Sequence, residues 1–415
     1  MENKKIIFGG LFFVIIIILI ISFLFIKKNN NESITIEQNP KKETEGNFIP
    51  YDLPENASKI TGLACENNNK RAFAVMYSGD KTARQYFSSL SLADFVLEMP
   101  HRPMHGQPRL MGVFQCNTPE IVGPMRSGRT DHISVAGSLD AIYVPWGGSS
   151  VGKALLEKRV INHIDCNGEV APGGGSACFR RSGPMSTLES ASSSIPELIK
   201  VAEKVGYRKE SQTKGFEHQG DLSLEKRPNY SRVRVKFENP SDVEYLYDKQ
   251  TNSYLRFFGG KEDIDYETKK QYAPKNLITI VTKKDAWLTD TDYVRQGLQD
   301  PWDGIDAEHR ENDNGQYPNM QLGDPWFDTK FEGPAEFFFN GQHIEGTWKR
   351  EKGLENPFKF FDEKGIEVHF VPGQIWMHVL EHSRTVSFED EKEYQERIED
   401  ETENVSATPA NSQEL

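Results

Sequence analysis

Two short turns rich in glycine and serine hold the residues best suited to chemistry. The first turn spans Gly123–Arg129 and the second spans Gly147–Ser150. Guanidinium groups pair bidentately with carboxylates and phosphates, and glycines let backbone N–H groups approach a ligand closely. We therefore expect the two turns to meet and to bind an anionic group. The residues expected to bind it are Arg126, Ser127, Arg129, Gly147, Gly148 and Ser149.

A structural role for the two arginines is the competing interpretation. Arg126 and Arg129 would then fix the turn by bonding to backbone carbonyls and to carboxylates such as Asp131 or Asp140. The sequence contains no P-loop, no G-x-S-x-G nucleophile turn and no paired-carboxylate signature. We therefore assign no catalytic residue and expect no cofactor.

One metalloprotease-like pattern, H-x-x-E-H, runs from His378 to His382. That chemistry requires both histidines on one face of a helix, but the surrounding residues predict a strand. Four positions apart in a strand, the histidines would lie ~13 Å from each other and would not share one zinc ion. We therefore expect no metal site.

The four cysteines allow three complete pairings. Cys166 and Cys178 flank a glycine-rich loop, so we expect this pair to form a disulfide if the domain is extracytoplasmic. Cys116 ends an apolar run and is interpreted as a small buried residue. Cys65 is expected to be free, in a flexible tether.

The elements that must position the two turns are short strands and helices. Alternating and apolar runs in the second half predict a mostly antiparallel sheet, beginning with Ser231–Glu238. A long acidic loop, residues 285–330, interrupts this sheet. In the first half, strands are expected over Arg71–Met76, Gly112–Gln115 and Ala141–Val144, and helices over Leu90–Met99, Thr130–Ala141, Ser150–Lys158 and Ile195–Val205.

The N-terminus contains an uncharged apolar run, Ile6–Ile26, of 21 residues. At ~1.5 Å per residue this helix would span the ~30 Å hydrocarbon core of a bilayer. A cleaved signal peptide is the alternative, but no small-residue cleavage site follows. We expect residues 1–5 in the cytoplasm, a membrane helix over 6–26, and a flexible tether over 27–69, with the rest of the chain outside.

Composition restricts the class of partner. The 415 residues are 37% hydrophobic and 27% charged, as in a folded protein, with a net charge of −13. This negative charge argues against general nucleic-acid binding. Residues 389–415 are acidic and poor in apolar residues, so we expect a disordered tail.

Several segments in the expected order carry a family resemblance. They include IVGPMRSGR (121–129), LDAIYV (139–144), YDKQTNSYLRFFGG (247–260) and FFFNGQHIEGTWKR (337–350). Over about residues 70–385 the chain resembles the bacterial YerB-like family, defined by the DUF3048 domain. The resemblance implies an extracytoplasmic protein, usually lipid-anchored, with an α+β fold in two lobes. It implies no particular activity.

The chain departs from the family pattern at two places. Tyr77-Ser78-Gly79-Asp80 stands where the family usually has Asp-Asn after its first strand. Pro184-Met185-Ser186 stands where the family usually has Pro-His-Asn. If those polar residues belong to a site, this chain has an altered version of it.

These expectations combine into one organisation and one function. We expect an α+β body with mixed and mostly antiparallel sheets, behind the membrane helix. Its parts are an N-terminal α/β lobe (70–208), a connection (209–228), a C-terminal β-rich lobe (229–388) and the tail (389–415). The expected function is binding of a cell-wall fragment or envelope protein through the two turns. The alternative is an envelope hydrolase or transferase acting on an anionic substrate.

Overall fold

A computed structural model describes residues 48–100, 108–237, 242–281, 287–289, 316–318, 322, 331–380 and 384–407. All of them belong to one unit of the chain, which begins at Asn47. The apolar run 6–26, most of the acidic loop 285–330 and His382 lie outside the described residues. Among the described helices, none is both long and apolar enough to cross a membrane.

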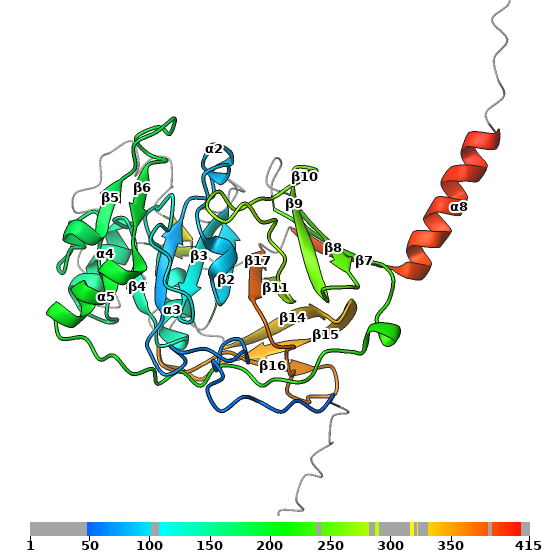
Figure 1. Ribbon diagram of the computed structural model, residues 1–415, viewed down its shortest axis with the longest axis horizontal. Helices are drawn as coiled ribbons and strands as arrows, with labels where there is room; N and C mark the ends of the chain where they lie inside the picture. Colours follow the sequence, from blue (N-terminus) through cyan, green and yellow to red (C-terminus); the bar gives the residue numbers. More distant parts are fainter. Residues whose placement is uncertain are drawn as a thin grey trace, which may run out of the picture. The chain divides into compact units, whose positions relative to one another are not determined.

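The described helices and strands are numbered in chain order, and Figure 1 labels many of them. The helices are α2 (Lys81–Arg84), α3 (Thr130–Ser138), α4 (Ser150–Glu157), α5 (Ile195–Lys204) and α8 (Glu391–Ala407). The strands of the first half are β1 (Phe73–Tyr77), β2 (Phe95–Pro100), β3 (Pro108–Phe114), β4 (Ile142–Val144), β5 (Cys178–Arg180) and β6 (Ala191–Ser193). Those of the second half are β7 (Ser231–Lys236), β8 (Val243–Asp248), β9 (Ser253–Phe258), β10 (Lys261–Glu262), β11 (Asn276–Val281), β12 (Trp287–Thr289), β13 (Gln316–Pro318), β14 (Glu332–Phe339), β15 (Gln342–Lys349), β16 (Lys359–Asp362), β17 (Ile375–Leu380) and β18 (Thr385–Asp390).

A mixed nine-stranded sheet forms the centre of the fold, in the order β16-β15-β14-β11-β17-β2-β3-β1-β4. Strand β17 runs parallel to both of its neighbours, β11 and β2, and β1 runs parallel to β4. The remaining pairs in this sheet are antiparallel. A second sheet, β10-β9-β8-β7-β18, is entirely antiparallel.

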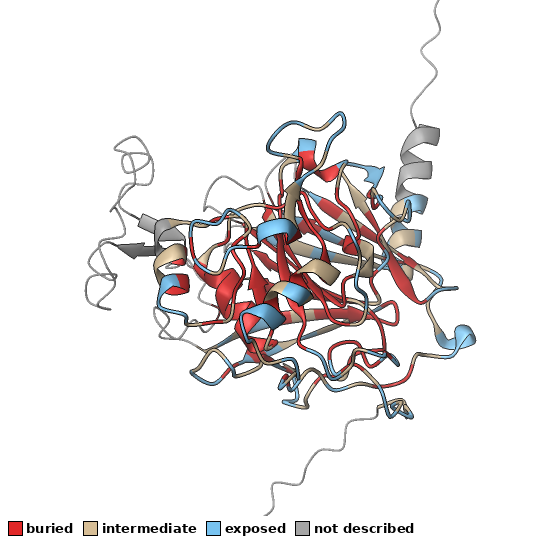
Figure 2. Cartoon of the chain, turned by 60° about the vertical axis from the view of Figure 1, so that its left-hand side comes forward, coloured by how far each residue is buried: buried red, intermediate tan, exposed pale blue. Residues whose placement is uncertain are grey.

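Two apolar cores lie on the two faces of the nine-stranded sheet. One contains the inward side chains of α3 and α4, including Ile133 and Leu155. The other contains side chains of α5 and of the antiparallel sheet, including Leu198 and Val233. The central strands are therefore buried on both faces, which explains why they are rich in apolar residues. Figure 2 shows buried residues concentrated in the middle of the body.

Local sequence explains the boundaries of these elements. Helix α5 begins after Ser194, whose side-chain oxygen accepts a hydrogen bond from the Glu197 N–H, and has Pro196 in its first turn. It is followed by Gly206, whose φ of +76° favours glycine. In β7, buried and more exposed residues alternate, as expected for a strand with one face on the core.

The two halves of the chain do not form two separate lobes, contrary to the prediction. Strand β17 of the C-terminal half lies between β2 of the N-terminal half and β11. The connection, residues 209–228, packs along the body, and the Gln219 N–H donates to the Phe370 carbonyl at 3.0 Å. The period of the apolar residues and the local composition indicate where strands lie, but they do not indicate which strands pair. The sharing of one sheet by the two halves was therefore not predicted.

Three predicted boundaries are also wrong. The tether prediction for residues 27–69 fails from residue 48 onward, because this part packs on the body and buries Ser58 and Ile60. The segment Leu90–Met99 forms a 3-10 turn followed by β2 rather than a helix. The predicted disordered tail begins with the last residues of β18 and continues as α8, where Tyr394 stacks on Tyr230 with ring centroids 4.1 Å apart.

Both pairs of cysteines are disulfide-bonded. Cys166 and Cys178, the pair expected from the sequence, have Cα atoms 5.2 Å apart. Cys65 and Cys116 are also paired, with Cα atoms 5.5 Å apart. The predictions of a free Cys65 and a reduced, buried Cys116 are therefore wrong, because the segment around Cys65 is folded against the end of β3.

Candidate anion-binding site

The two glycine-rich turns lie side by side. Gly128 and Gly148 form a parallel β-bridge. The Gly128 N–H donates to the Gly147 carbonyl at 3.0 Å, and the Ser149 N–H donates to the Gly128 carbonyl at 3.4 Å. These bonds hold the two turns together, and they occupy backbone N–H groups that would otherwise be available to a ligand.

The first turn is fixed on both of its sides. The Ser78 N–H, just beyond β1, donates to the Pro124 carbonyl, and the Met125 N–H donates to the Ala191 carbonyl, each at 2.8 Å. Gly128 is required for close packing, because a Cβ atom there would lie 1.8 Å from the hydroxyl oxygen of Tyr143. The turn is therefore a rigid part of the fold and positions its arginines with little freedom.

The side chain of Arg126 points toward α2 rather than toward the second turn. Its guanidinium forms an ion pair with Asp80 at 3.0 Å and donates a hydrogen bond to the Leu188 carbonyl. The Arg126 side chain is 16% exposed and the Asp80 side chain 40% exposed. Arg126 thus meets a carboxylate, as the structural interpretation expected, but the carboxylate is neither Asp131 nor Asp140.

A third arginine, Arg109 of β3, joins the two arginines of the turn. Its guanidinium donates to the Ser127 carbonyl. Burial, together with the nearby positive charges of Arg129 and Arg126, lowers the pKa of Arg109 well below its ordinary value. Three guanidinium groups therefore gather around the first turn, and we call Arg109, Arg126 and Arg129 the arginine cluster.

Sequence reasoning missed Arg109 because the strand was predicted to begin at Gly112, whereas β3 begins at Pro108. The available signal was the position of this residue at the start of the apolar run RLMGVF, residues 109–114. An arginine inside a buried strand must be paired or must serve a site.

The remaining predicted residues have mainly structural contacts. Ser149 is the N-cap of α4, and its side-chain oxygen accepts a hydrogen bond from the Gly152 N–H at 3.2 Å. The Gly147 N–H donates to Asp165 at 2.8 Å, and the φ of +70° at Gly147 favours glycine. The Arg129 guanidinium donates to the Gly128 carbonyl at 2.8 Å.

The two segments that depart from the family pattern both lie beside Arg126. Asp80 is the last residue of the first segment, and Leu188 lies two residues beyond the second. Burial acts to raise the pKa of Asp80, but the hydrogen bond from Ser78 and the positive charges of Arg126 and Arg109 lower it overall. Asp80 is therefore ionised at neutral pH and partly offsets the charge of the arginine cluster.

A second charged cluster lies between the two sheets and is fully buried. Glu98 of β2 pairs with Arg84 at 2.6 Å and with Arg256 at 2.9 Å. The Nδ1 atom of His378 lies 3.4 Å from the same carboxylate, and the His378 Nε2 atom is 2.9 Å from the Tyr245 hydroxyl. Burial lowers the pKa of His378, which favours the neutral imidazole. Its place in β17 agrees with the predicted strand.

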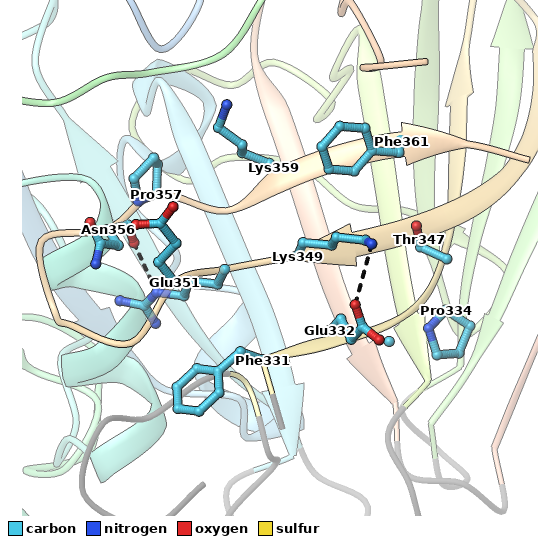
Figure 3. A pocket seen from close by; sticks show the side chains of 12 residues that line it. Phe331, Glu332, Pro334, Thr347, Lys349, Glu351, Asn356, Pro357, Lys359 and Phe361 are labelled. Atoms are coloured by element: carbon cyan, nitrogen blue, oxygen red, sulfur yellow. Dashed lines mark hydrogen bonds and ion pairs between the residues drawn. The ribbon is translucent and has the colours of Figure 1, made fainter. Parts of the chain in front are cut away.

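The surface also has hollows away from the two turns, and the residues predicted to bind an anion do not line the one described next. A large hollow of about 1010 Å³ lies over β14, β15 and β16, where Lys349 pairs with Glu332 at 3.3 Å (Figure 3). Within the described ranges, no group of three or more histidine, cysteine, aspartate or glutamate residues is placed to hold a metal ion.

Comparison with known proteins assigns the chain to a family. The family model described as protein of unknown function (DUF3048), N-terminal domain, matches residues 60–208, and the corresponding C-terminal domain matches residues 233–377. The chain belongs to the DUF3048 family. The boundary between the two family domains lies in the connection, although strands from both domains share the central sheet.

A curated relative and a solved structure agree with this assignment. The chain is 28% identical over 341 residues to the putative lipoprotein YerB of Bacillus subtilis (strain 168), which covers 79% of this chain and 88% of the relative. The crystal structure of the YerB protein from Bacillus subtilis has a TM-score of 0.61 with this chain, at 24% identity, and the match covers 80% of this chain and 99% of the other. The YerB-like α+β fold predicted from the sequence is confirmed at this level.

Proposed function

We propose that this protein is a membrane-anchored, extracytoplasmic binding protein whose arginine cluster takes a carboxylate or phosphate of a cell-wall fragment or envelope protein. The observation that carries the proposal is the gathering of Arg109, Arg126 and Arg129 around one rigid turn. Fixed guanidiniums recognise planar anions with little loss of side-chain entropy on binding. In a protein with a net charge of −13, such a cluster concentrates positive potential at one place.

The contacts of the cluster favour binding over catalysis. Arg126 forms an ion pair with Asp80, whose side chain is 40% exposed. An incoming anion can therefore displace the Asp80 carboxylate from the Arg126 guanidinium. The hydroxyl of Ser149 caps a helix, and the hydroxyl of Tyr143 is buried, which raises its pKa. These hydroxyls are therefore poor nucleophiles, and we prefer a binding protein to the hydrolase or transferase alternative.

Three features support the extracytoplasmic part of the proposal. The relative's name describes a lipoprotein. Two disulfides are present, and disulfides persist in oxidising compartments. The uncharged run Ile6–Ile26 is long enough to anchor the chain in the bilayer in place of a lipid. Protease added to intact spheroplasts should digest the body of the protein, whereas protection until lysis would contradict this topology.

Binding is tested with two probes, a soluble muropeptide that carries free carboxylates and glycerol 3-phosphate. Titration calorimetry on the wild type should show saturable binding of at least one probe. Arg126→Lys and Arg109→Lys should each weaken that binding about tenfold, because lysine keeps the charge but loses the planar fork.

The matched control is Arg234→Lys on β7, where the arginine pairs with Glu244 and is half exposed. This variant should bind like the wild type. If Arg126→Lys and Arg109→Lys lower the melting temperature but leave the affinity per folded molecule unchanged, the arginines are structural and the proposal is wrong.

A further inference from the structure

A second pocket lies at the opposite end of the strands that carry the arginine cluster. Strand β1 pairs Tyr77 with Leu110 at the end near that cluster and Phe73 with Phe114 at the other end. Four residues along a strand correspond to ~13 Å. The pocket, of about 220 Å³, opens beside Phe73 and Phe114, under α5, and shares no lining residue with the arginine cluster.

The floor of this pocket is an apolar row across three strands. Phe73 is the register partner of Phe114 on β3 and of Ile142 on β4, so the three side chains lie next to one another on the same face of the sheet. Helix α5 forms the wall with Ile195 and Ile199, one turn apart. Ile199 is only partly buried, although it packs on this core.

Four basic residues line the pocket: Lys70, Arg71, Arg208 and Lys209. Backbone pairing between the segments at 70–71 and 209–210 brings them together. The Arg71 N–H donates to the Lys209 carbonyl at 2.8 Å, and Lys70 forms a β-bridge with Glu210. This pairing places Lys70 and Lys209 on the same rim. The disulfide Cys65–Cys116 holds the neighbouring segment in place.

The positive charges on this rim are not all neutralised by the protein itself. Arg71 and Arg208 are both held by Asp140, at 3.5 Å and 2.6 Å. Lys209 pairs with Glu203 at 2.7 Å. Lys70 is exposed and forms no ion pair within 4 Å with any residue that the structure describes, although its charge interacts with that of Glu203, which also lines the pocket. An anion at the mouth of the pocket could therefore pair with the ammonium group of Lys70, next to Lys209, which is already paired with Glu203.

We propose that this pocket binds a small anionic amphiphile, with its hydrocarbon part on the Phe73–Phe114–Ile142 floor and its carboxylate at Lys70. The volume sets the size of the ligand. It is below the roughly 300–1,000 Å³ of pockets for drug-sized ligands, so a short aliphatic or single-ring carboxylate fits. This inference does not depend on the arginine cluster.

The probes are hexanoate and its uncharged counterpart hexanamide, measured by ligand-observed NMR and by titration calorimetry on the full chain. Hexanoate should bind saturably, and hexanamide should bind at least threefold more weakly. Lys70→Gln should weaken hexanoate binding about three- to fivefold, the range expected for a partly exposed ion pair. Ile199→Trp should abolish binding, because the larger side chain fills the pocket.

Two controls keep the outcome unambiguous. Lys261→Gln, at an exposed lysine of β10, should bind hexanoate like the wild type, and the melting temperature of every variant shows whether it is folded. Equal affinity for hexanoate and hexanamide would contradict the role of Lys70. Binding that survives in folded Ile199→Trp but is lost in Arg126→Lys would place the carboxylate in the arginine cluster. That result, or no saturable binding of either probe to the wild type, would overturn the proposal.

Discussion

At the scale of single residues, Glu98 is at the centre of a buried charge network. It is fully buried between the two sheets and pairs with two arginines, Arg84 and Arg256. Burial acts to raise its pKa, but Arg256 and Arg84 lower it well below the ordinary value, so the carboxylate is charged when folded. A buried charge that loses its partner is strongly destabilising, because the remaining charge is not solvated by water.

We therefore expect Glu98→Gln to lower the free energy of unfolding by about 3–5 kcal/mol, measured by urea denaturation. The matched control is Glu244→Gln, where the side chain is 32% exposed and pairs with Arg232 and Arg234. Because water screens this pair, the control should cost about 1 kcal/mol or less. Equal costs for the two variants would show that the buried network does not stabilise the fold.

Asp94 predicts a dependence of stability on pH. Burial raises its pKa to about 6, although the N–H groups of Gln115 and Cys116 donate to it. The folded pKa lies above the unfolded value of about 3.9, so the folded state binds the proton more tightly. Stability from this group is present at low pH and is lost as pH rises through about 6, by roughly 3 kcal/mol in total.

Asp94→Asn removes this titration. Urea denaturation of both proteins at pH 4 to 7.5 should show the wild type losing stability relative to the variant as pH increases. A constant difference between the two proteins over this range would be the contrary result.

Residue-level reasoning from the sequence found part of the candidate site. It identified the turn with Arg126 and Arg129, because charged residues within a glycine-rich turn are visible in the sequence. It did not find Arg109, and it named Asp80 only as part of a departure from the family pattern, because the contacts of both residues with the turn depend on how distant segments pack together. Side-chain direction was also beyond reach, so Arg126 was expected at the second turn rather than against Asp80.

At the scale of elements, the first turn approaches β4 so closely that Gly128 has no room for a side chain. Gly128→Ala should lower the free energy of unfolding by about 1–3 kcal/mol, because its Cβ would collide with Tyr143. It should also displace the turn and weaken anion binding. The control Gly148→Ala meets its nearest neighbour, Lys153, at an ordinary 3.4 Å and should cost less, about 1 kcal/mol or below. Similar losses in both variants would contradict the packing argument.

The disulfides join elements that are separated along the chain. Cys65–Cys116 spans 51 residues and Cys166–Cys178 spans 12. In the chain-entropy model, replacing both cysteines of a pair by serine should cost about 4 kcal/mol for the longer loop and about 3 kcal/mol for the shorter one. Urea denaturation measures these costs.

A thiol assay provides the independent check on the pairing. The native, non-reduced protein should contain no reactive thiol, and four should appear after denaturation and reduction. Free thiols in the denatured but non-reduced protein would show that the pairing is incomplete.

The elements themselves were largely predictable, because apolar period and capping residues are local properties. Helices α3, α4 and α5 and strand β7 of the antiparallel sheet lie where the sequence predicted them. The failure at Leu90–Met99 has a physical cause. Strand β2 is buried on both faces, and a continuous apolar run can be interpreted as a helix as readily as a strand.

At the scale of the whole molecule, the interleaved central sheet makes the two halves dependent on each other. A fragment of residues 48–208 would leave β2 without its neighbour β17 and would expose the core beneath the antiparallel sheet. We expect calorimetry to show no cooperative unfolding of this fragment, and a single transition for the full chain. Two transitions in the full chain, or cooperative melting of the fragment near the full-chain temperature, would restore the two-lobe interpretation.

The position of β17 also bears on how the chain reaches its folded state. This strand closes the gap between β2 and β11, yet it begins about 280 residues after β2 begins. Such non-local pairing slows folding, since a long loop must close before the contacts form. During synthesis the central sheet stays open until almost the entire chain has emerged. If the body crosses the membrane, as the proposed extracytoplasmic location requires, this late closure would keep it unfolded until it has reached the far side.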